Sequence, residues 1–495
     1  MLTHRRGGWG VRALLALLLL ASAPPAFAQP PPARWVEVGV HPQAARQPTA
    51  IGRTLAALEA WHGQLYAGYG DYGDNTGPIG ISPFDPATAA FTQVHVSDTE
   101  AIQNWRAIGD QLWAPATDRR KDADFAVGEP WRDARPIGTT HAYDIVTIDG
   151  DDLWLAGSSG VRAALWRSLD GGATWALAQA EGPASGIQND FARYYFAGVL
   201  GGRLYVQADD FYGAPHARSR IFDGSAWADG PNLLWGSMGW RPLAFGGEMV
   251  YQGSAQGGPL LRFDGSAPVR RAVGWNASAV TVAGDMLYVL RQRFPAGADG
   301  LDRAVVRTAD LESWEVLEAP APDGARSLAV LDGSLYAGAT EARLFGLQGD
   351  AAWRPEPVAW NAKPVIHALR PVSGTAFARG DAIPLEAEAT DADGTVARGQ
   401  FWFGALKLAE LGAPPFAVRW TDAPTGTHRI MFRAVDDAGD YVEAWTTVVV
   451  EARENPTEPT PEPTATTSVP TELPTQASAA WRIHLPWVQR GAIAR

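Results

Sequence analysis

A short strand pattern recurs between residues 65 and 338, and its spacing restricts the fold more than any other feature of the chain. Each copy begins with leucine or methionine and has tyrosine or tryptophan within the next two residues. Successive copies begin 38 to 51 residues apart, about 45 on average. Each follows a polar turn, such as Asp332-Gly333, of the kind that joins two strands in a hairpin. The copies begin at Leu65, Leu112, Leu153, Leu204, Met249, Leu287 and Leu335.

Each repeat contains enough residues for four strands. An apolar segment precedes the turn, as at residues 328–331, and an aspartate followed by an aromatic residue comes later, as at Asp170 and Trp175. Four short strands per unit are typical of a β-propeller blade. We therefore predict an all-β chain with a seven-bladed β-propeller over residues 35–358. Six or eight blades stay open, because residues 35–38 have the pattern of a strand that would complete the last blade.

One repeat carries a specific turn motif. Residues 168–175, with the sequence SLDGGATW, match the pattern S-x-D-x-G-x-T-W. This resembles the Asp-box of BNR repeats in sialidase-like propellers. The resemblance implies a turn on the outer rim, in which Asp170 accepts backbone hydrogen bonds and Trp175 packs between sheets. It does not imply sialidase activity, because an Arg-Ile-Pro signature near the start and a Tyr–Glu nucleophile pair are missing.

The character of the sequence changes after residue 362. Residues 363–452 contain short alternating segments and the pattern A-x-D-x-D-G-x-V … A-x-D-x-x-G. This resembles bacterial Ig-like modules and implies a β-sandwich that serves as a spacer or adhesive unit. Residues 453–478 are rich in Thr, Pro and Glu and predict a disordered linker. Residues 479–495 are short, aromatic and basic. We interpret them as a surface-sorting signal or as a strand that docks on the Ig-like module.

The N-terminus has the pattern of a secretory signal peptide over residues 1–28. Arg5 and Arg6 precede an apolar run, and residues 26–28 form a small-x-small cleavage site. We expect an exported bacterial protein, extracellular or attached to the cell surface. The mature chain has no stretch that predicts a transmembrane segment.

Composition excludes several classes of function. The 495 residues carry a formal net charge of −13 and include no cysteine. Thiolate metal sites, cysteine nucleophiles and disulfide scaffolds are therefore excluded, and nucleic acid is not an expected partner. We expect a monomer that binds an extracellular glycan, another polymer or a protein. We expect no cofactor, although calcium stays open.

Ligand contacts are expected where the loops that enter the innermost strands converge over one mouth of the propeller. Arginine and aromatic side chains gather 6–12 residues before the repeated strands; guanidinium groups suit carboxylate or sulfate, and rings suit sugars. The alternative is that these residues cap blade ends. Tyr143, Arg193, Tyr195 and Trp275 occupy the same window. The assigned ligand contacts are Arg53, Arg106, His141, Tyr194, Trp240, Arg241, Asn276 and Arg326.

Two further sets of side chains predict chemistry only weakly. Glu100 and Asp144 could provide the paired carboxyls of a glycosidase. Asp71, Asp74 and Asn75 could bind calcium, or they could cap their own turns. The leading hypothesis is a secreted or surface recognition protein for a carbohydrate or anionic polymer. The alternatives are a glycoside hydrolase or lyase with carboxylates at the mouth, and a protein–protein scaffold without a small-molecule site.

Overall fold

The computed structural model describes residues 32–453, except 119–123, 137, 184–186, 211–217, 236–238, 255–256, 267–268 and 294–301. The signal peptide, almost the whole linker and the C-terminal tail lie outside these residues. Strands dominate, and the helices of the described chain are two 3₁₀ turns, η1 (Ala44–Arg46) and η2 (Thr340–Ala342). The all-β prediction is confirmed. Across the described part, no helix is long and apolar enough to span a membrane.

Four antiparallel four-stranded sheets follow one another along the first half of the chain. The first contains β2 (Ala57–Trp61), β3 (Gln64–Gly68), β5 (Phe84–Asp85) and β6 (Ala90–Phe91). The second contains β8 (Arg106–Ile108), β9 (Gln111–Pro115), β10 (Phe125–Gly128) and β11 (Arg132–Ala134). The third contains β12 (His141–Thr147), β13 (Leu153–Ser159), β14 (Arg162–Ser168) and β15 (Ala176–Glu181). The fourth contains β16 (Ala192–Leu200), β17 (Arg203–Asp210), β18 (Arg218–Phe222) and β19 (Trp227–Asp229).

A larger sheet follows and divides at one long strand. Its strands are β20 (Trp240–Phe245), β21 (Glu248–Gln252), β22 (Gly258–Phe263), β23 (Arg270–Ala283), β24 (Met286–Arg293), β25 (Asp302–Thr308), β26 (Trp314–Leu317), β30 (Trp353–Pro355) and β31 (Trp360–Ala362). The start of β23 pairs with β22, and its second half pairs with β24. This sheet therefore contains two further four-stranded units that share β23.

The last sheet joins the two ends of the assembly. It contains β27 (Ala325–Leu331), β28 (Ser334–Ala339), β29 (Arg343–Gln348) and, from the start of the chain, β1 (Arg34–Val40). Arg34 lies opposite Gln348 in the antiparallel pair of β1 and β29. The strand expected at residues 35–38 therefore does complete the last sheet. A separate two-stranded sheet joins β4 (Ile79–Ile81) to β7 (His95–Ser97).

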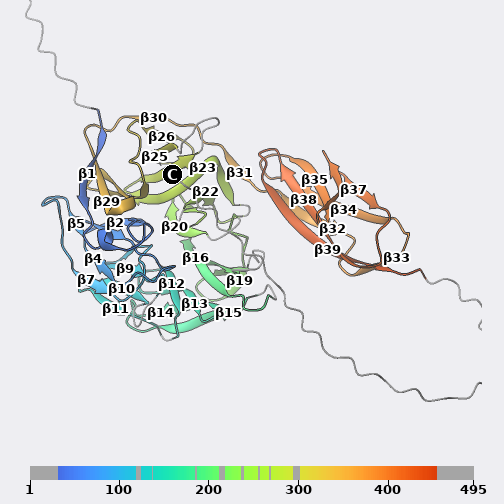
Figure 1. Cartoon of the computed structure of the whole chain (residues 1–495), viewed down its shortest axis with the longest axis horizontal. Coiled ribbons are helices and arrows are strands. Elements are labelled where there is room, and N and C mark those ends of the chain that lie inside the picture. The colour runs from blue at the N-terminus through green and yellow to red at the C-terminus, as the bar shows by residue number, and fades with distance from the viewer. Residues whose placement is uncertain are drawn as a thin grey trace, which may run out of the picture.

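The first strand of each unit faces a common centre. β8 contacts β12, and the series continues through β16, β20, β23 and β27 to β2. The sheets accordingly surround one centre when viewed along the short axis of the molecule (Figure 1). Four-stranded units arranged in this way are consistent with propeller blades. We call the first strands the inner strands. The mouth is the end at which each inner strand begins to pair with the second strand of its sheet.

The repeated residues of the sequence form the cores between the sheets. Leu65, Leu112, Leu153, Leu204, Met249, Leu287 and Leu335 are each at most 5% exposed. Trp105, Trp113, Trp154 and Trp166 are also buried almost completely. Burying such a side chain contributes about 1.5–3 kcal/mol relative to exposure. The spacing of the repeated leucine and methionine residues in the sequence therefore equals the spacing of successive sheet units along the chain.

The turn at residues 168–175 has the hydrogen bonds expected of it. The Asp170 carboxylate accepts from the backbone N–H of Thr174 at 2.8 Å and from the hydroxyl of Ser168 at 2.7 Å. Gly171 and Gly172 have φ angles of 63° and 91°, which favour glycine. The Trp175 ring packs against Trp113 and Phe125 of the preceding sheet. The motif is a structural turn that also links two sheets.

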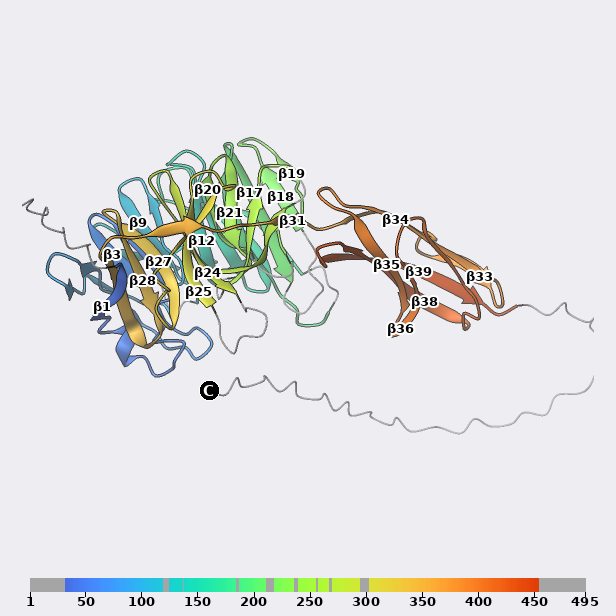
Figure 2. The same ribbon diagram turned by 90° about the horizontal axis from the view of Figure 1, so that it is seen from above.

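The C-terminal module is a separate two-sheet sandwich beside the N-terminal sheets (Figure 2). One sheet contains β32 (Val365–Arg370), β34 (Ile383–Thr390) and β37 (Phe416–Trp420). The other contains β33 (Thr375–Ala378), β39 (Tyr441–Glu451), β38 (Gly426–Asp436), β35 (Val396–Phe403) and β36 (Leu406–Leu411). Phe401, Phe416 and Phe432 lie between the sheets. The alternation seen in residues 383–389 places Ile383, Leu385 and Ala387 in this core.

Polar contacts join the two domains. The Arg271 guanidinium of β23 forms an ion pair with Asp440 of the sandwich. The Asn361 side chain donates to Asp436 at 3.0 Å and to Asp440 at 2.8 Å. The backbone N–H of Ala362 donates to Asp393 at 2.9 Å. Asp393 therefore accepts a hydrogen bond from the connection between the domains.

Candidate functional site

Five inner strands have a register shift near the start of their pairing with the second strand of the sheet. The shifts lie between Ala142 and Asp144, Tyr194 and Phe196, Trp240 and Leu243, Ala277 and Ala279, and Ala325 and Ser327. A bulge leaves an extra residue outside the ladder and redirects its side chain. Because all five shifts occur at the same end of neighbouring inner strands, they belong to one region, the mouth. The residues within the shifts are Tyr143, Tyr195, Arg241, Pro242, Ser278 and Arg326.

Arg193 organises a group of rings at the mouth. Its Nη1 donates to the Tyr143 hydroxyl at 2.7 Å, and its Nη2 donates to His141 Nε2 at 2.9 Å. The ring centroids of Tyr143 and Tyr195 are 4.6 Å apart, and those of Tyr143 and Trp240 are 6.4 Å apart. Residues from β12, β16 and β20 therefore meet here. We call His141, Tyr143, Arg193, Tyr195 and Trp240 the mouth cluster.

Hydrogen bonds define how the His141 ring is held in the mouth cluster, and burial keeps the two phenols protonated. Since Arg193 donates to Nε2 of His141, the histidine proton lies on Nδ1, which is 3.2 Å from Oδ1 of Asp118. Burial raises the pKa of Tyr143 and that of Tyr195 above the usual value of a phenol. Both tyrosines therefore stay uncharged at neutral pH.

Arg193 is the cationic group of the mouth cluster, and its hydrogen bonds go to neutral side chains. It makes no ion pair with a carboxylate among the residues that the structure describes. Its Nε is buried and has no hydrogen-bond partner there. Nη1 and Nη2 are held by Tyr143 and His141, so the guanidinium plane is fixed. A fixed guanidinium beside aromatic faces suits an anionic, ring-shaped ligand group.

Two ion pairs lie next to the mouth cluster, since Asp144 follows Tyr143 and Arg241 follows Trp240 in the sequence. Arg106 Nε and Nη2 donate to the two carboxylate oxygens of Asp144 at 2.8 and 2.7 Å. The Arg241 guanidinium pairs with Glu59 of β2. A cavity beside Trp240 and Arg241 has a volume of only about 20 Å³, room for about one water molecule. This cavity is therefore too small for a sugar ring.

The structure brings some of the assigned ligand residues together and separates others. His141 and Trp240 belong to the mouth cluster, while Arg106 and Arg241 lie in the ion pairs next to it. Arg53 pairs with Glu341 at 2.9 Å, near η2. Asn276 is exposed on β23, and Arg326 is half-buried in the shift of β27.

Tyr194 was assigned from the sequence, but its side chain leaves the mouth. Its hydroxyl contacts Glu181 and Gln179 on β15 of the preceding sheet. Adjacent residues of a strand point to opposite faces, so the neighbouring Tyr195 takes the place expected for Tyr194. The shift after Tyr194 could not be read from the sequence.

The two candidate catalytic carboxylates each have a partner of their own. Asp144 is held by Arg106 and by the Asn104 amide, whose Nδ2 lies 2.8 Å from Oδ1. Glu100 is buried, and the Asn75 amide, with its nitrogen toward Glu100, donates to the two carboxylate oxygens at 2.8 and 3.1 Å. Asp144 therefore joins inner strands to each other, and Glu100 holds the loop that contains Asn75.

The calcium candidates cap their own segment of chain. The Asp71 carboxylate accepts from Thr49 at 2.8 Å and from the backbone N–H of Gly73 at 3.0 Å. Asn75 has a positive φ of 52° and turns its side chain to Glu100, while Asp74 is exposed. Over the described residues, no group of three or more His, Cys, Asp or Glu side chains could hold a metal ion.

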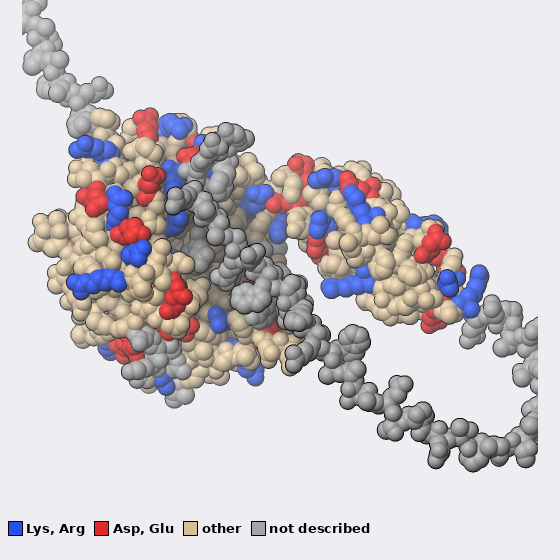
Figure 3. All heavy atoms as spheres, in the orientation of Figure 1, with Lys and Arg blue, Asp and Glu red and all other residues tan. Residues whose placement is uncertain are grey.

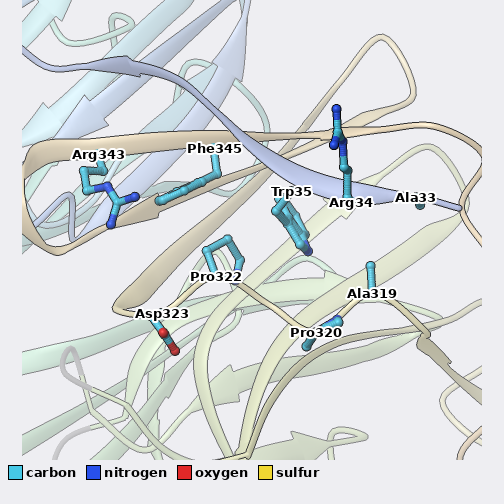
Figure 4. A pocket seen from close by; sticks show the side chains of 9 residues that line it. All are labelled: Ala33, Arg34, Trp35, Ala319, Pro320, Pro322, Asp323, Arg343 and Phe345. Carbon is cyan, nitrogen blue, oxygen red and sulfur yellow. The ribbon is translucent and has the colours of Figure 1, made fainter. Parts of the chain in front are cut away.

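A larger cavity, of about 400 Å³, lies away from the mouth cluster (Figure 4). It lies between β1, β29 and residues 319–323, and its walls include Trp35, Phe345 and Pro322. Arg343 at its edge is already paired with Glu37 and lies over the Phe345 ring. This cavity is mainly apolar, and no residue of the mouth cluster lines it.

Asp118 is a neighbour of the mouth cluster that the sequence argument missed. It precedes β10, in the connection between the second and third strands of its sheet. The sequence prediction was confined to the connections that enter inner strands, whereas both kinds of connection end at the mouth. Including the connections after each repeated strand would have found it. On the face seen in Figure 3, basic and acidic side chains are mixed over both domains, so charge alone does not mark the site.

Comparison with known proteins identifies the second domain. Residues 364–431 match the family model described as the bacterial Ig domain. The C-terminal module is a bacterial Ig domain. No curated protein matches the chain.

Several solved structures are similar to this chain. One is the extracellular domain assigned to a one-component system of B. thetaiotaomicron, at 11% identity and a TM-score of 0.39. That alignment covers 85% of this chain and 59% of the other, so this chain spans less than two thirds of that structure. The polysaccharide lyase Uly1 is similar at 9% identity and a TM-score of 0.27, covering 85% of this chain and 99% of the other. The fibronectin(III)-like modules of Clostridium thermocellum CbhA match at 25% identity and a TM-score of 0.16, covering 18% and 93%.

Proposed function

We propose that the chain is a secreted or surface-displayed recognition protein whose N-terminal sheets close into a seven-bladed β-propeller. Its mouth cluster binds an extracellular carbohydrate or anionic polymer. The observation that carries this proposal is Arg193, whose guanidinium is held by Tyr143 and His141 and has no carboxylate partner among the described residues. An arginine fixed in this way is ready to pair with an anion without further ordering.

The rings around Arg193 supply the second half of the recognition. Tyr143, Tyr195 and Trp240 bring aromatic surface beside the guanidinium. Aromatic faces pack against the apolar faces of sugar rings, while the guanidinium pairs with a carboxylate or sulfate substituent. The combination favours an acidic sugar over an isolated small anion.

The remaining parts of the chain support an extracellular location. The N-terminal 28 residues have the pattern of a signal peptide, and the second domain is a bacterial Ig domain. The Thr/Pro/Glu-rich residues 453–478 would hold both domains away from an attachment point. In this arrangement the bacterial Ig domain acts as a spacer and the mouth faces the medium.

Affinity electrophoresis and calorimetry of the exported chain test the proposal. We expect binding to polygalacturonate or dextran sulfate and none to neutral dextran. Arg193→Gln removes the charge and should weaken binding about 10- to 100-fold, the effect of losing a charged hydrogen bond worth about 1.5–3 kcal/mol. Arg203→Gln, at an exposed position at the far end of the adjacent strand β17, is the matched control and should bind normally.

Two other results would replace this proposal. Release of new chain ends from a bound polymer, lost in Glu100→Gln or Asp144→Asn variants that are shown by tryptophan fluorescence to be folded, would make the chain a glycosidase or lyase. Equal binding of the wild type and Arg193→Gln to every anionic polymer would show that the mouth cluster is not the binding site.

A further inference from the structure

A second group of arginines lies toward the mouth, on β24, β25 and β27. Arg291 and Arg293 share two acids: Asp302 is 2.7 Å from Arg293 and 3.3 Å from Arg291. Glu356 is 3.4 Å from Arg293 and 3.8 Å from Arg291. These four side chains balance one another in charge.

Two neighbouring arginines do not take part in these ion pairs. Arg303 and Arg326 make no ion pair with a carboxylate within the described ranges. Among the residues that the structure describes, the Arg326 Nη1 donates to the carbonyl of its own neighbour Ala325, at 3.1 Å. The Nε of Arg303 is buried and has no hydrogen-bond partner in the described part of the chain. The backbone N–H of Ala321, on the segment that leads into β27, donates to the carbonyl of Arg303 at 3.2 Å, so Arg303 lies beside this segment. Burial, and then the charge of Arg303, lower the pKa of Arg326.

The position of this pair relates it to the mouth cluster. Arg326 occupies the register shift of β27, as Tyr143 and Tyr195 occupy those of β12 and β16. Arg303 lies opposite Gln292 of β24, and the Gln292 amide donates to Ser278 in the shift of β23 at 3.0 Å. Arg326 therefore lies within one of the register shifts at the mouth, and Arg303 lies opposite a residue that is hydrogen-bonded to another.

The pair lies in a different sector of the mouth from Arg193. Arg193 is on β16, and the inner strands β20 and β23 separate β16 from β27. One sugar residue cannot be expected to reach both arginine sites. A polymer with a charge on each repeat could reach both at once.

We propose that Arg303 and Arg326 form a second anion subsite, and that the ligand of the mouth is a linear polyanionic glycan. One carboxylate or sulfate group of the chain pairs with Arg193 and another, several sugars away, pairs with Arg303 and Arg326. This rests on the proposed function above. The formal net charge of −13 repels a polyanion at long range, so binding depends on several local pairs acting together. Two linked subsites make affinity increase with the length of the ligand.

Calorimetry with galacturonate oligomers of increasing length, from the dimer to the dodecamer, tests this proposal, with dextran sulfate as the sulfated arm. We expect affinity to rise at least about tenfold once an oligomer spans both subsites. Arg303→Gln with Arg326→Gln should reduce the affinity of the longest oligomer to that of the shortest, and should leave the shortest unchanged. The salt dependence of binding should also become less steep.

The controls separate this inference from the proposed function. Arg307→Gln changes an arginine of the same strand β25 that is paired with Glu315, and should leave both affinities unchanged. If Arg193→Gln abolishes binding while the double variant binds long and short oligomers as the wild type does, the second subsite is wrong and the proposed function stands. If no carboxylated or sulfated polymer binds the wild type, both are wrong. Arg326→Lys, which keeps the charge and loses the planar fork, should give an intermediate affinity if the glutamine variants unfold.

Discussion

Arg106 and Asp144 form a two-point ion pair between two inner strands, with Nε to Oδ1 2.8 Å and Nη2 to Oδ2 2.7 Å. The same Nη2 also lies 3.1 Å from the carbonyl oxygen of Pro242 on β20. The pair therefore ties β8, β12 and β20 together across the centre. Side chains that the sequence marks as candidates for ligand binding and catalysis thus hold the sheets in place.

Replacing Asp144 should destabilise the N-terminal domain strongly. Only 2% of the Asp144 side chain and 11% of the Arg106 side chain are exposed, so Asp144→Asn leaves a buried cation without its charge partner. Breaking a buried pair in this way costs about 3–5 kcal/mol. Denaturant unfolding followed by tryptophan fluorescence measures the loss. Glu37→Gln breaks the exposed pair with Arg343 and should cost no more than about 1 kcal/mol. Equal effects of the two changes would contradict the prediction that burial makes the first pair the stronger one.

The fold could be predicted well from the sequence because buried residues of the same type recur at similar intervals along the chain. The leucine or methionine of every repeat is buried, and successive repeats begin at similar spacings of 38 to 51 residues. The site was predicted less well because contacts there join strands that are distant in the chain. Arg106 and Asp144 are close only because β8 and β12 are neighbours at the centre. Likewise, Tyr195 and not Tyr194 reaches the mouth because of a register shift that has no signature in the sequence.

Alkaline pH should destabilise the protein through its buried tyrosines. Burial raises the pKa of Tyr66 to about 12, with a smaller contribution from the charge of Glu129, and burial also raises the pKa of Tyr143 and Tyr195. An unfolded tyrosine loses its proton near pH 10, while the folded chain retains it. Stability is therefore complete below about pH 10 and falls as the pH rises toward the folded pKa values.

Thermal unfolding between pH 8 and pH 11.5 measures this effect. We expect the midpoint to fall more steeply above pH 10 in the wild type than in Tyr66→Phe. Tyr441→Phe, at a half-exposed position of the bacterial Ig domain, is the control and should follow the wild type. A midpoint independent of pH across this range would contradict the prediction.

The junction between the domains should loosen when Arg271 is removed. Arg271 pairs with Asp440, and the two side chains are 17% and 14% exposed. Arg271→Ala leaves Asp440 with the Asn361 amide and removes the charged contact between β23 and the bacterial Ig domain. Small-angle scattering should then show a broader range of domain arrangements, and proteolysis should cut faster near Lys363. Arg433→Ala, which breaks the pair with Glu443 within the module, should change neither. Identical scattering from wild type and Arg271→Ala would show that other contacts hold the junction.

The turn at Asp170 should lose its stabilising effect in acid. Hydrogen bonds from Thr174 and Ser168 lower the pKa of Asp170 to about 2, below the value of about 3.9 for an unfolded aspartate. A lowered folded pKa stabilises the native state above the unfolded value, and this stabilisation disappears as the pH falls from about 4 toward 2. We therefore expect Asp170→Ala to lower the melting temperature at pH 6, and the gap from wild type to shrink steadily below pH 4. Asp110→Ala, at an exposed position in another hairpin turn, should show no such gap. If the gap for Asp170→Ala stayed constant down to pH 2, the carboxylate charge would have no part in the turn, and only its shape would matter.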